Sequence, residues 1–293
     1  MRVLRLTVLL LVVCAMQPVP GGVEVVDDAG QRIDLAQPAE RIIALAPFLT
    51  ELLFAAGAGA QVVAGVEYSD FPASAKTLPH VGDYNKFDVE KILALKPDLL
   101  VAWISGNPAK EVEILQRLGL TVLRSEPRSL EDVSRTLVLL GKVADTESHA
   151  RRAARDFDAR LQLLQAGAAG TRKLSVFYQV WDRPLITVNG QHLISDVLRR
   201  CGGRNVFAHL PNLAPRLDTE AVLRANPQVI IASGDGDRPP QWLDDWRRWP
   251  ELQAVRYDNL YFVPPALIQR HTPRILQGMQ RLCEQLALAR AKL

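Results

Sequence analysis

The chain has 293 residues, of which 48% are hydrophobic and 23% are charged. This length is typical of about two domains, and the composition excludes a disordered chain, a collagen-like fibre and a small disulfide-rich scaffold. The formal net charge is +3, of which Arg2 and Arg5 contribute two, so the rest of the chain is too close to neutral to indicate nucleic-acid binding.

The first residues have the pattern of an export signal. A basic start at residues 1–5 precedes an apolar run at 6–15, and proline and glycine then interrupt the run at 17–22. We expect residues 1–22 to be a signal peptide that is cleaved between about 15 and 22 and that carries Cys14 away. The run is shorter than the roughly 20 apolar residues of a membrane span, and an uncleaved anchor helix is the alternative.

From residue 23 onward, short β-branched runs alternate with helical patterns. Two runs flank a turn at 27–30 and predict a hairpin. The further expected strands are 41–46, 62–66, 99–103 and 121–123, and the expected helices are 50–56 and 109–118. Strands that alternate with helices predict βα units and a mostly parallel sheet. Residues 23–145 are therefore expected to form an N-terminal α/β lobe.

A different pattern follows at residues 146–165, where apolar residues recur at helical spacing on one face. A helix of that length is about 30 Å long, which is enough to link two lobes. We assign 146–168 to a linking backbone helix and 169–293 to a C-terminal α/β lobe, in which the βα rhythm resumes. The predicted fold class is α/β, with two lobes that have parallel-type sheets and flanking helices and are joined by one long, rigid backbone helix.

No local motif in the sequence indicates catalysis or a metal site. The histidines show none of the spacings of a zinc site, and neither Ser105 nor Ser233 lies in a nucleophile-elbow motif. We therefore predict no catalytic residues, no metal and no cofactor of the protein's own. The five histidines are His80, His149, His192, His209 and His271.

Aromatic residues at the ends of predicted strands are the clearest functional signal. Tyr68 and Trp103 end or follow strands, and Tyr84 lies in the segment Val-Gly-Asp-Tyr-Asn. Residues beyond the carboxyl ends of parallel strands line the ligand crevice of an open sheet, and aromatic rings there suit a large planar ligand. Any one of them alone would be explained by a half-buried core aromatic, but three in one lobe favour a binding surface.

Several longer segments resemble a known family. The segments Arg-Ile-Ile-Ala-Leu-Ala-Pro at 41–47, Thr-Glu-Leu-Leu-Phe-Ala-Ala-Gly at 50–57 and Cys-Gly-Gly-Arg-Asn-Val-Phe at 201–207 are similar to periplasmic binding proteins for vitamin B12 and ferric siderophores. Within that superfamily, Tyr-Ser-Asp-Phe-Pro at 68–72 and Val-Ala-Trp-x-x-Gly-Asn at 101–107 most resemble the cobalamin-binding members. The similarity extends from about residue 23 to the last predicted helix.

The resemblance implies a ligand cleft between two lobes, with aromatic side chains that clamp the ligand. By motif position, the implied ligand-binding residues are Tyr68, Tyr84, Trp103, Ile186 and Arg270. Tyr84 stands in place of a tryptophan and Ile186 in place of a phenylalanine. The second lobe departs further, because Ala214 and Ala266 replace a tryptophan and an aspartate, and Trp181 is a candidate for the missing aromatic.

The resemblance also implies a function and further residues that serve it. The expected protein captures cobalamin or a related corrinoid in the periplasm, after signal-peptide removal, and delivers it as a monomer to the permease subunits of an ABC importer. Glu90 and Glu220 match the glutamates with which such proteins dock on the permease, although both are also explained by the dipole at a helix start. Cys201 and Cys283 match two family cysteines and are expected to form a disulfide, with two buried thiols as the alternative.

Four other functions stay open from the sequence. Tyr68 is compatible with a haem receptor, in which a tyrosine commonly binds the iron, and a ferric siderophore receptor would belong to the same superfamily. An exported enzyme would need a cluster of titratable groups that the sequence does not display. A docking or sensor protein would have the same aromatic cleft but no small-molecule ligand.

Overall fold

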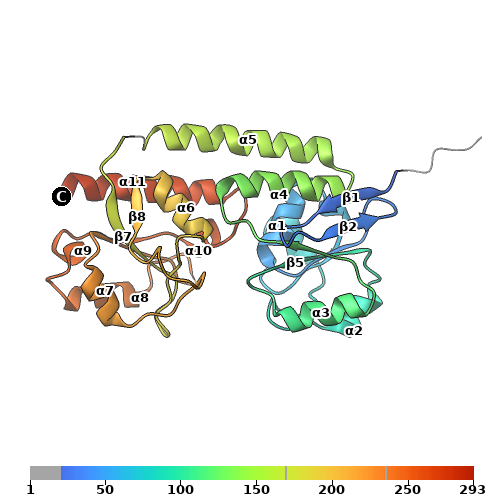
Figure 1. The fold of residues 1–293 in the computed structure, drawn as a ribbon, viewed down its shortest axis with the longest axis horizontal. Coiled ribbons are helices and arrows are strands. Elements are labelled where there is room, and N and C mark those ends of the chain that lie inside the picture. The colour runs from blue at the N-terminus through green and yellow to red at the C-terminus, as the bar shows by residue number, and fades with distance from the viewer. Residues whose placement is uncertain (1–20, 169, 235) are drawn as a thin grey trace, which may run out of the picture.

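The computed structural model describes residues 21–168, 170–234 and 236–293, so the expected signal peptide at 1–22 lies almost entirely outside the described residues. Two α/β lobes stand side by side and are joined along one edge by the long helix α5 (Glu147–Ala166), as Figure 1 shows. The predicted fold class of two lobes with parallel sheets, flanking helices and one connecting helix is confirmed.

The first lobe contains a parallel sheet with strand order β4-β3-β5-β6 and, beside it, the antiparallel hairpin β1-β2. Its central strands are buried on both faces, as parallel sheets covered by helices require. Its elements are β1 (Val23–Val26), β2 (Arg32–Leu35), β3 (Ile42–Ala44), α1 (Pro47–Ala55), β4 (Val62–Ala64), α2 (Val89–Ala94), β5 (Leu99–Trp103), α3 (Ala109–Arg117), β6 (Val122–Ser125) and α4 (Leu130–Val143).

The second lobe repeats this arrangement. Its parallel sheet has the order β8-β7-β9-β10. In the parallel sheet of each lobe, the first strand along the chain therefore pairs with the second and third, and the third pairs with the fourth. Its elements are β7 (Leu174–Gln179), α6 (Leu193–Arg200), β8 (Gly203–Asn205), α7 (Thr219–Ala225), β9 (Val229–Ala232), α8 (Gln241–Asp244), α9 (Gln253–Arg256), β10 (Leu260–Phe262), α10 (Pro265–Ile268) and α11 (Ile275–Lys292). The sequence pattern of this lobe also predicts a helix near 241–249, where the structure has instead the short α8 followed by a 3-10 turn.

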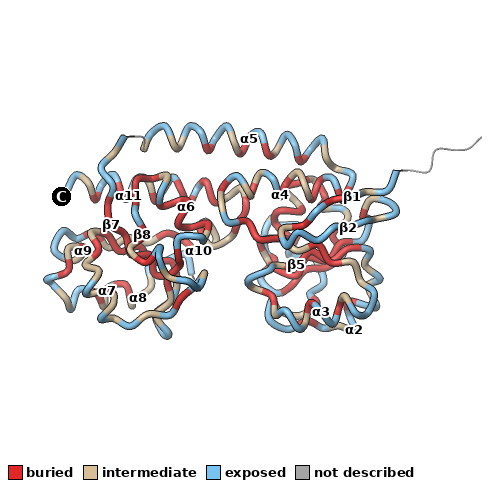
Figure 2. The backbone as a smooth tube through the Cα atoms, viewed as in Figure 1, coloured by how far each residue is buried: buried red, intermediate tan, exposed pale blue. Residues whose placement is uncertain are grey.

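One apolar core extends through both lobes. Buried side chains follow one another from the first sheet through α4, α5, α6 and α11 into the second sheet, and Figure 2 shows buried residues in these elements. Examples along this path are Val101, Leu137, Phe157, Val176 and Met279. The opposite face of each sheet has its own smaller cluster. The two lobes are therefore packed together through the helices and are not merely tethered.

Helices α4 and α5 approach each other closely along the first lobe. Ser129 and Asp132 begin α4 with reciprocal side-chain to backbone hydrogen bonds, which is a capping box. Near the other end of α4, a Cβ atom at Gly141 would lie 2.2 Å from the Cβ of Ala150 on α5. Only glycine allows the two helices to pack at this distance.

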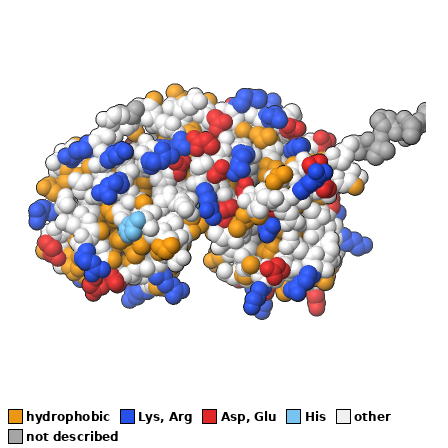
Figure 3. All heavy atoms as spheres, in the orientation of Figure 1, with side chains coloured by type: hydrophobic (Ala, Val, Ile, Leu, Met, Phe, Trp, Pro, Cys, Tyr) orange, Lys and Arg blue, Asp and Glu red, His pale blue; other side chains and the backbone are white. Residues whose placement is uncertain are grey.

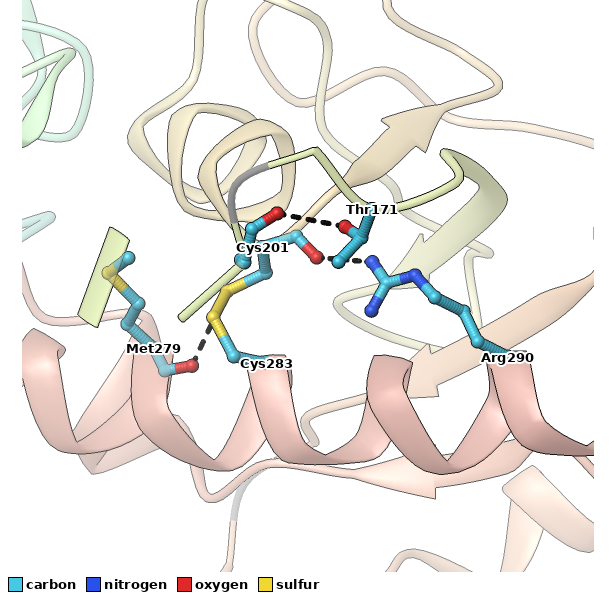
Figure 4. Close-up of a disulfide and its surroundings, with 6 residues drawn as sticks. Thr171, Cys201, Met279, Cys283 and Arg290 are labelled. Carbon is cyan, nitrogen blue, oxygen red and sulfur yellow. Dashed lines mark hydrogen bonds between the residues drawn. A yellow bond between two sulfur atoms is a disulfide. The ribbon is translucent and has the colours of Figure 1, made fainter. Parts of the chain in front are cut away.

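The expected disulfide between Cys201 and Cys283 is present, and it joins the end of α6 to the middle of α11 (Figure 4). Cys201 is fully buried, and the Arg290 guanidinium donates a hydrogen bond to its carbonyl oxygen at 2.6 Å. Because 82 residues separate the two cysteines, the bond closes most of the second lobe into one loop.

Candidate functional site

A cavity of about 620 Å³ lies between the lobes, and Figure 3 shows the molecule hollowed there. Its walls are formed where strands of both sheets end. Phe48 follows β3, Tyr68 follows β4, Trp103 ends β5, Trp181 follows β7, and Pro265 follows β10. The carboxyl ends of the strands in an open parallel sheet are the usual place for a ligand, and here the two lobes direct those ends at one another.

Four aromatic residues around the cavity have partly exposed rings. Tyr68 is 70% exposed, while Tyr84 and Trp181 are 39% and 38% exposed, and the ring of Trp103 is half-buried. Tyr68 also adopts a left-handed backbone conformation with φ of 64°. A bulky residue rarely adopts this conformation unless its surroundings impose it, and such strain is concentrated at functional sites.

The structure brings together most of the residues that the sequence indicated. Tyr68, Tyr84, Trp103 and Arg270 all line the cavity. Ile186 is not among the lining residues; its backbone pairs with that of Trp181, and Trp181 is the member of this pair that faces the cavity. The second-lobe aromatic is therefore Trp181, the residue paired with the position that the motif comparison gave.

Phe48, Asp70 and Gln269 are among the lining residues that sequence reasoning did not identify. Phe48 lies in the first turn of α1, immediately after β3, so the strand-end rule could have found it. Asp70 is in the same short segment as Tyr68. Gln269 follows α10, a helix of four residues that the sequence pattern does not reveal.

Charged side chains cross from the second lobe to the first beside the cavity. The Arg270 guanidinium bonds the carboxylate of Asp70 and donates to the carbonyl oxygen of Tyr68 at 3.1 Å. Burial raises the pKa of the Asp70 carboxyl. The hydrogen bond and charge of Arg270, a backbone hydrogen bond and the charge of Arg274 together outweigh burial and leave the pKa below its ordinary value.

A second ion pair lies deeper between the lobes. Glu51, which is 2% exposed, accepts two hydrogen bonds of 2.7 Å from Arg274 and one of 2.6 Å from the Thr272 hydroxyl. A buried carboxylate is tolerated only when it is paired and hydrogen-bonded in this way. The start of α11 is thereby fixed against α1 of the other lobe.

A cluster of rings fills the space beneath the cavity. Phe48 and Trp103 of the first lobe meet His271 of the second at centroid distances of 5.4 and 6.2 Å, and His192 lies 5.4 Å from His271. Burial lowers the pKa of His271 to about 4. Burial also lowers the pKa of His192 to about 3, helped by His271 and by the charge of Arg128. Both rings are therefore neutral at neutral pH.

Acid should destabilise the protein through His271. Because its folded-state pKa lies below the ordinary value of 6.5, the unfolded chain binds more protons as the pH falls from about 6.5 to about 4, and stability is lost across that window. A shift of this size corresponds to about 3 kcal/mol. We expect the free energy of unfolding of the wild type to decrease between pH 7 and pH 4. In His271→Phe this decrease should be smaller by about 3 kcal/mol, as measured by denaturant titration at each pH.

The matched control for this measurement is His209→Phe, since His209 is exposed. The pH dependence of this variant should equal that of the wild type, because the replacement leaves His271 and the buried residues around it unchanged. Equal slopes for His271→Phe and the wild type would contradict the prediction.

The two glutamates that the sequence singled out lie at equivalent places in the two lobes. Glu90 is in the first turn of α2, which precedes β5, and Glu220 is in the first turn of α7, which precedes β9. Both are exposed, and each helix is capped by an aspartate two residues earlier, Asp88 or Asp218. In Figure 1 both helices lie at the lower ends of their lobes, on the side where the hollow of Figure 3 opens.

The described residues offer little for other kinds of site. Residues 21–168, 170–234 and 236–293 contain no group of three or more His, Cys, Asp or Glu side chains placed to hold a metal ion. Within the same ranges, no helix combines the length and the apolar character that crossing a bilayer requires.

Comparison with known proteins adds three findings. A family model described as periplasmic binding protein matches residues 42–267. The vitamin B12-binding protein of Vibrio parahaemolyticus is 38% identical over 259 residues, which cover 87% of this chain and 92% of the relative. The crystal structure of the periplasmic vitamin B12 binding protein of Vibrio cholerae is 37% identical with a TM-score of 0.80, and the match covers 86% of this chain and 98% of that one.

A structure of lower identity shares the fold alone. The periplasmic heme-binding protein from Roseiflexus in its apo form is 20% identical with a TM-score of 0.74, over 86% of this chain and 99% of that one.

Proposed function

The chain belongs to the periplasmic binding protein family, and we propose that it captures cobalamin in the periplasm and delivers it to an ABC importer. It is a binding protein and needs no cofactor of its own; cobalamin is its cargo. The observation that carries the proposal is the cavity between the lobes, where aromatic rings from both sheets surround one space.

The chemistry of the cavity suits a large and weakly charged macrocycle. Tyr68, Tyr84, Trp103 and Trp181 offer broad apolar faces with polar edges, which grip a flat ligand by buried area and ring contacts. Among the lining residues that the structure describes, the charged ones are Asp70, Asp237 and Arg270, and Arg270 is already paired with Asp70. A neutral ligand can therefore bind while the ion pair between Asp70 and Arg270 stays intact.

The pairing of Arg270 with Asp70 also makes a ferric siderophore a less suitable ligand than a neutral macrocycle. Such a receptor commonly presents arginines to anionic oxygens, whereas the arginine in this cavity is committed to a carboxylate. The phenol of Tyr68 keeps haem as the competing candidate, because this side chain is 70% exposed at the mouth of the cavity and could reach an iron atom.

For delivery, we propose that Glu90 and Glu220 contact the permease. The repeated strand order of the two lobes supports this assignment, because it places α2 and α7 at matching positions on the side where the cavity opens. An acidic residue on each lobe would allow a pair of cationic sites on the transporter to recognise both lobes at once. We expect the protein to act as a monomer after removal of the signal peptide.

Cyanocobalamin should bind with a stoichiometry of one and should quench tryptophan fluorescence. Trp103→Ala should weaken binding by about 1–3 kcal/mol, the range for an aromatic residue at the centre of an interface. Isothermal titration and fluorescence titration measure both effects. Trp249→Ala is the matched control, since Trp249 packs on Trp246 outside the cavity and its loss should leave the affinity unchanged.

Haem provides the decisive alternative in this experiment. If the protein binds haemin tightly and does not bind cyanocobalamin, and if the iron–tyrosinate absorption disappears in Tyr68→Phe, the proposed ligand is wrong and the protein is a haem receptor.

A further inference from the structure

We propose that Asn107 is a positioning residue that sets the aromatic wall of the ligand cavity, by holding the ends of three first-lobe segments with one buried amide group. This inference rests on the proposed function, because its consequence is measured on ligand affinity. Asn107 itself does not line the cavity, and its side chain is directed into the lobe, where the residue is 5% exposed.

Asn107 fixes the backbone of Trp103 from both sides. The Asn107 side-chain oxygen Oδ1 accepts a hydrogen bond from the Trp103 N–H at 2.6 Å, and the Asn107 N–H donates to the Trp103 carbonyl oxygen at 3.0 Å. These two bonds close the turn that follows β5. The backbone donor and acceptor of Trp103 thus both bond to one residue, which fixes the direction in which the indole leaves the sheet.

The amide nitrogen of the same side chain reaches two other segments. Asn107 Nδ2 donates to the Leu45 carbonyl oxygen at 2.9 Å and to the Tyr84 carbonyl oxygen at 2.8 Å. Leu45 directly follows β3, and the next residues lead into Phe48. One side chain therefore ties together the backbone segments that carry Trp103, Tyr84 and Phe48, all of which line the cavity.

Gly106, the residue before Asn107, also fixes the position of the Trp103 indole. A Cβ atom built on Gly106 would lie 1.8 Å from Cε3 and 2.2 Å from Cζ3 of Trp103, so the ring rests directly on the Gly106 backbone. On its other side, the ring meets Phe48 edge-on at a centroid distance of 5.5 Å. Gly106 and Asn107 together leave the ring little room to turn.

Asparagine fits this position because the site requires one acceptor and two donors from a single small side chain. Aspartate has the same shape but offers only acceptors, so its carboxylate would face the carbonyl oxygens of Leu45 and Tyr84 without a proton to share. Leucine has nearly the same size but offers neither donors nor acceptors. Either change leaves buried backbone groups unsatisfied and allows the three segments to separate.

A matched residue exists in the other lobe. Asn189 is 2% exposed, its Oδ1 accepts from the Gln191 N–H at 2.9 Å, and its Nδ2 donates to the Leu210 carbonyl oxygen at 3.1 Å. Asn189 is likewise a buried asparagine that organises loops, but it does not hold a segment that lines the cavity. Its replacement separates a general loss of stability from a specific effect on the binding surface.

The test compares cyanocobalamin affinity among Asn107→Asp, Gly106→Ala and Asn189→Asp, each at a temperature at which circular dichroism shows the variant to be folded. We expect affinity to fall at least about tenfold in Asn107→Asp and in Gly106→Ala, corresponding to roughly 1.4 kcal/mol, and to change less than about twofold in Asn189→Asp. Gly106→Ala retains the hydrogen bonds of Asn107 and displaces only the indole ring of Trp103. If Asn107→Asp does not fold, this variant still tests whether the position of Trp103 determines the affinity.

A ligand-free readout distinguishes this inference from the proposed function. The near-ultraviolet dichroism of Trp103 is obtained as the difference between each protein and the same protein carrying Trp103→Phe. We expect Asn107→Asp to change this difference spectrum strongly and Asn189→Asp to leave it unchanged. If the wild type does not bind cyanocobalamin, the proposed ligand fails, while the spectrum still tests the role of Asn107. Wild-type affinity and an unaltered Trp103 spectrum in both first-lobe variants would overturn the inference.

Discussion

Transport should stop when Glu90 and Glu220 are both replaced by lysine, while the affinity for cobalamin stays almost unchanged. Both glutamates are exposed on helix starts outside the cavity, so reversing their charge leaves the ligand contacts intact. The reversed charges would repel the cationic sites that we propose on the permease, and like charges at an interface cost several kcal/mol. Uptake of labelled cobalamin and stimulation of the transporter ATPase measure the effect. Because these charges are at the rim, the single variants should lose more activity at low salt than at high salt.

The control for this experiment reverses two acidic residues elsewhere. Asp156 on α5 and Glu284 on α11 are exposed, and in Figure 1 their helices lie on the side away from the mouth of the cavity. Asp156→Lys with Glu284→Lys makes the same change in net charge and should transport normally. Normal transport by the Glu90 and Glu220 double variant would show that the two glutamates only stabilise the starts of their helices.

Loss of the disulfide should lower the free energy of unfolding by up to about 4–5 kcal/mol, which is the chain-entropy estimate for a loop closed over 82 residues. The Cys201→Ala and Cys283→Ala double variant removes the bond, and denaturant titration measures the loss. Reduction of the wild type by dithiothreitol should produce a similar decrease, whereas the double variant should not respond to the reductant. Titration of the denatured, unreduced protein should find no free thiol from these two residues; two reactive thiols would show that the bond does not form in the periplasm.

The sequence predicted the longest helix but missed other elements, both long and short. The linking helix was evident, because apolar residues recur at helical spacing over twenty residues, and the structure has α5 at Glu147–Ala166. Helix α4 was missed although its signals are present, since the Ser129 and Asp132 capping box precedes Val133, Leu137 and Leu140 at helical spacing. Strand β8 has only three residues and begins with glycine, so nothing local predicts it. It forms because β7 lies beside it and provides the hydrogen bonds.

Local sequence patterns predict part of the candidate site, and the rest depends on contacts between segments that are distant in sequence. Tyr68 follows β4 and Trp103 ends β5, so the rule that strand ends line a crevice accounts for these two residues. Tyr84 lies in the loop before α2, and its place in the cavity wall depends on the fold of that loop. The second-lobe wall depends on how a loop folds back upon itself. Trp181 and Ile186 pair across this loop, and only the three-dimensional pairing determines which of them faces the ligand. The ion pairs of Asp70 with Arg270 and of Glu51 with Arg274 join residues about 200 positions apart, which no local pattern could connect.

The apolar core that continues from one sheet to the other through α4, α5, α6 and α11 makes the two lobes one mechanical body. Arg200 of α6 strengthens this junction, since it pairs with Asp196 on its own helix and with Glu131 on α4. Moving the lobes widely apart would expose apolar surface at about 25 cal/mol for each Å², so thermal motion alone opens the cavity only slightly. We expect a captured ligand to be retained while the protein diffuses. If Glu90 and Glu220 contact the permease as proposed, release would require the transporter to hold both lobes and move them against this shared core.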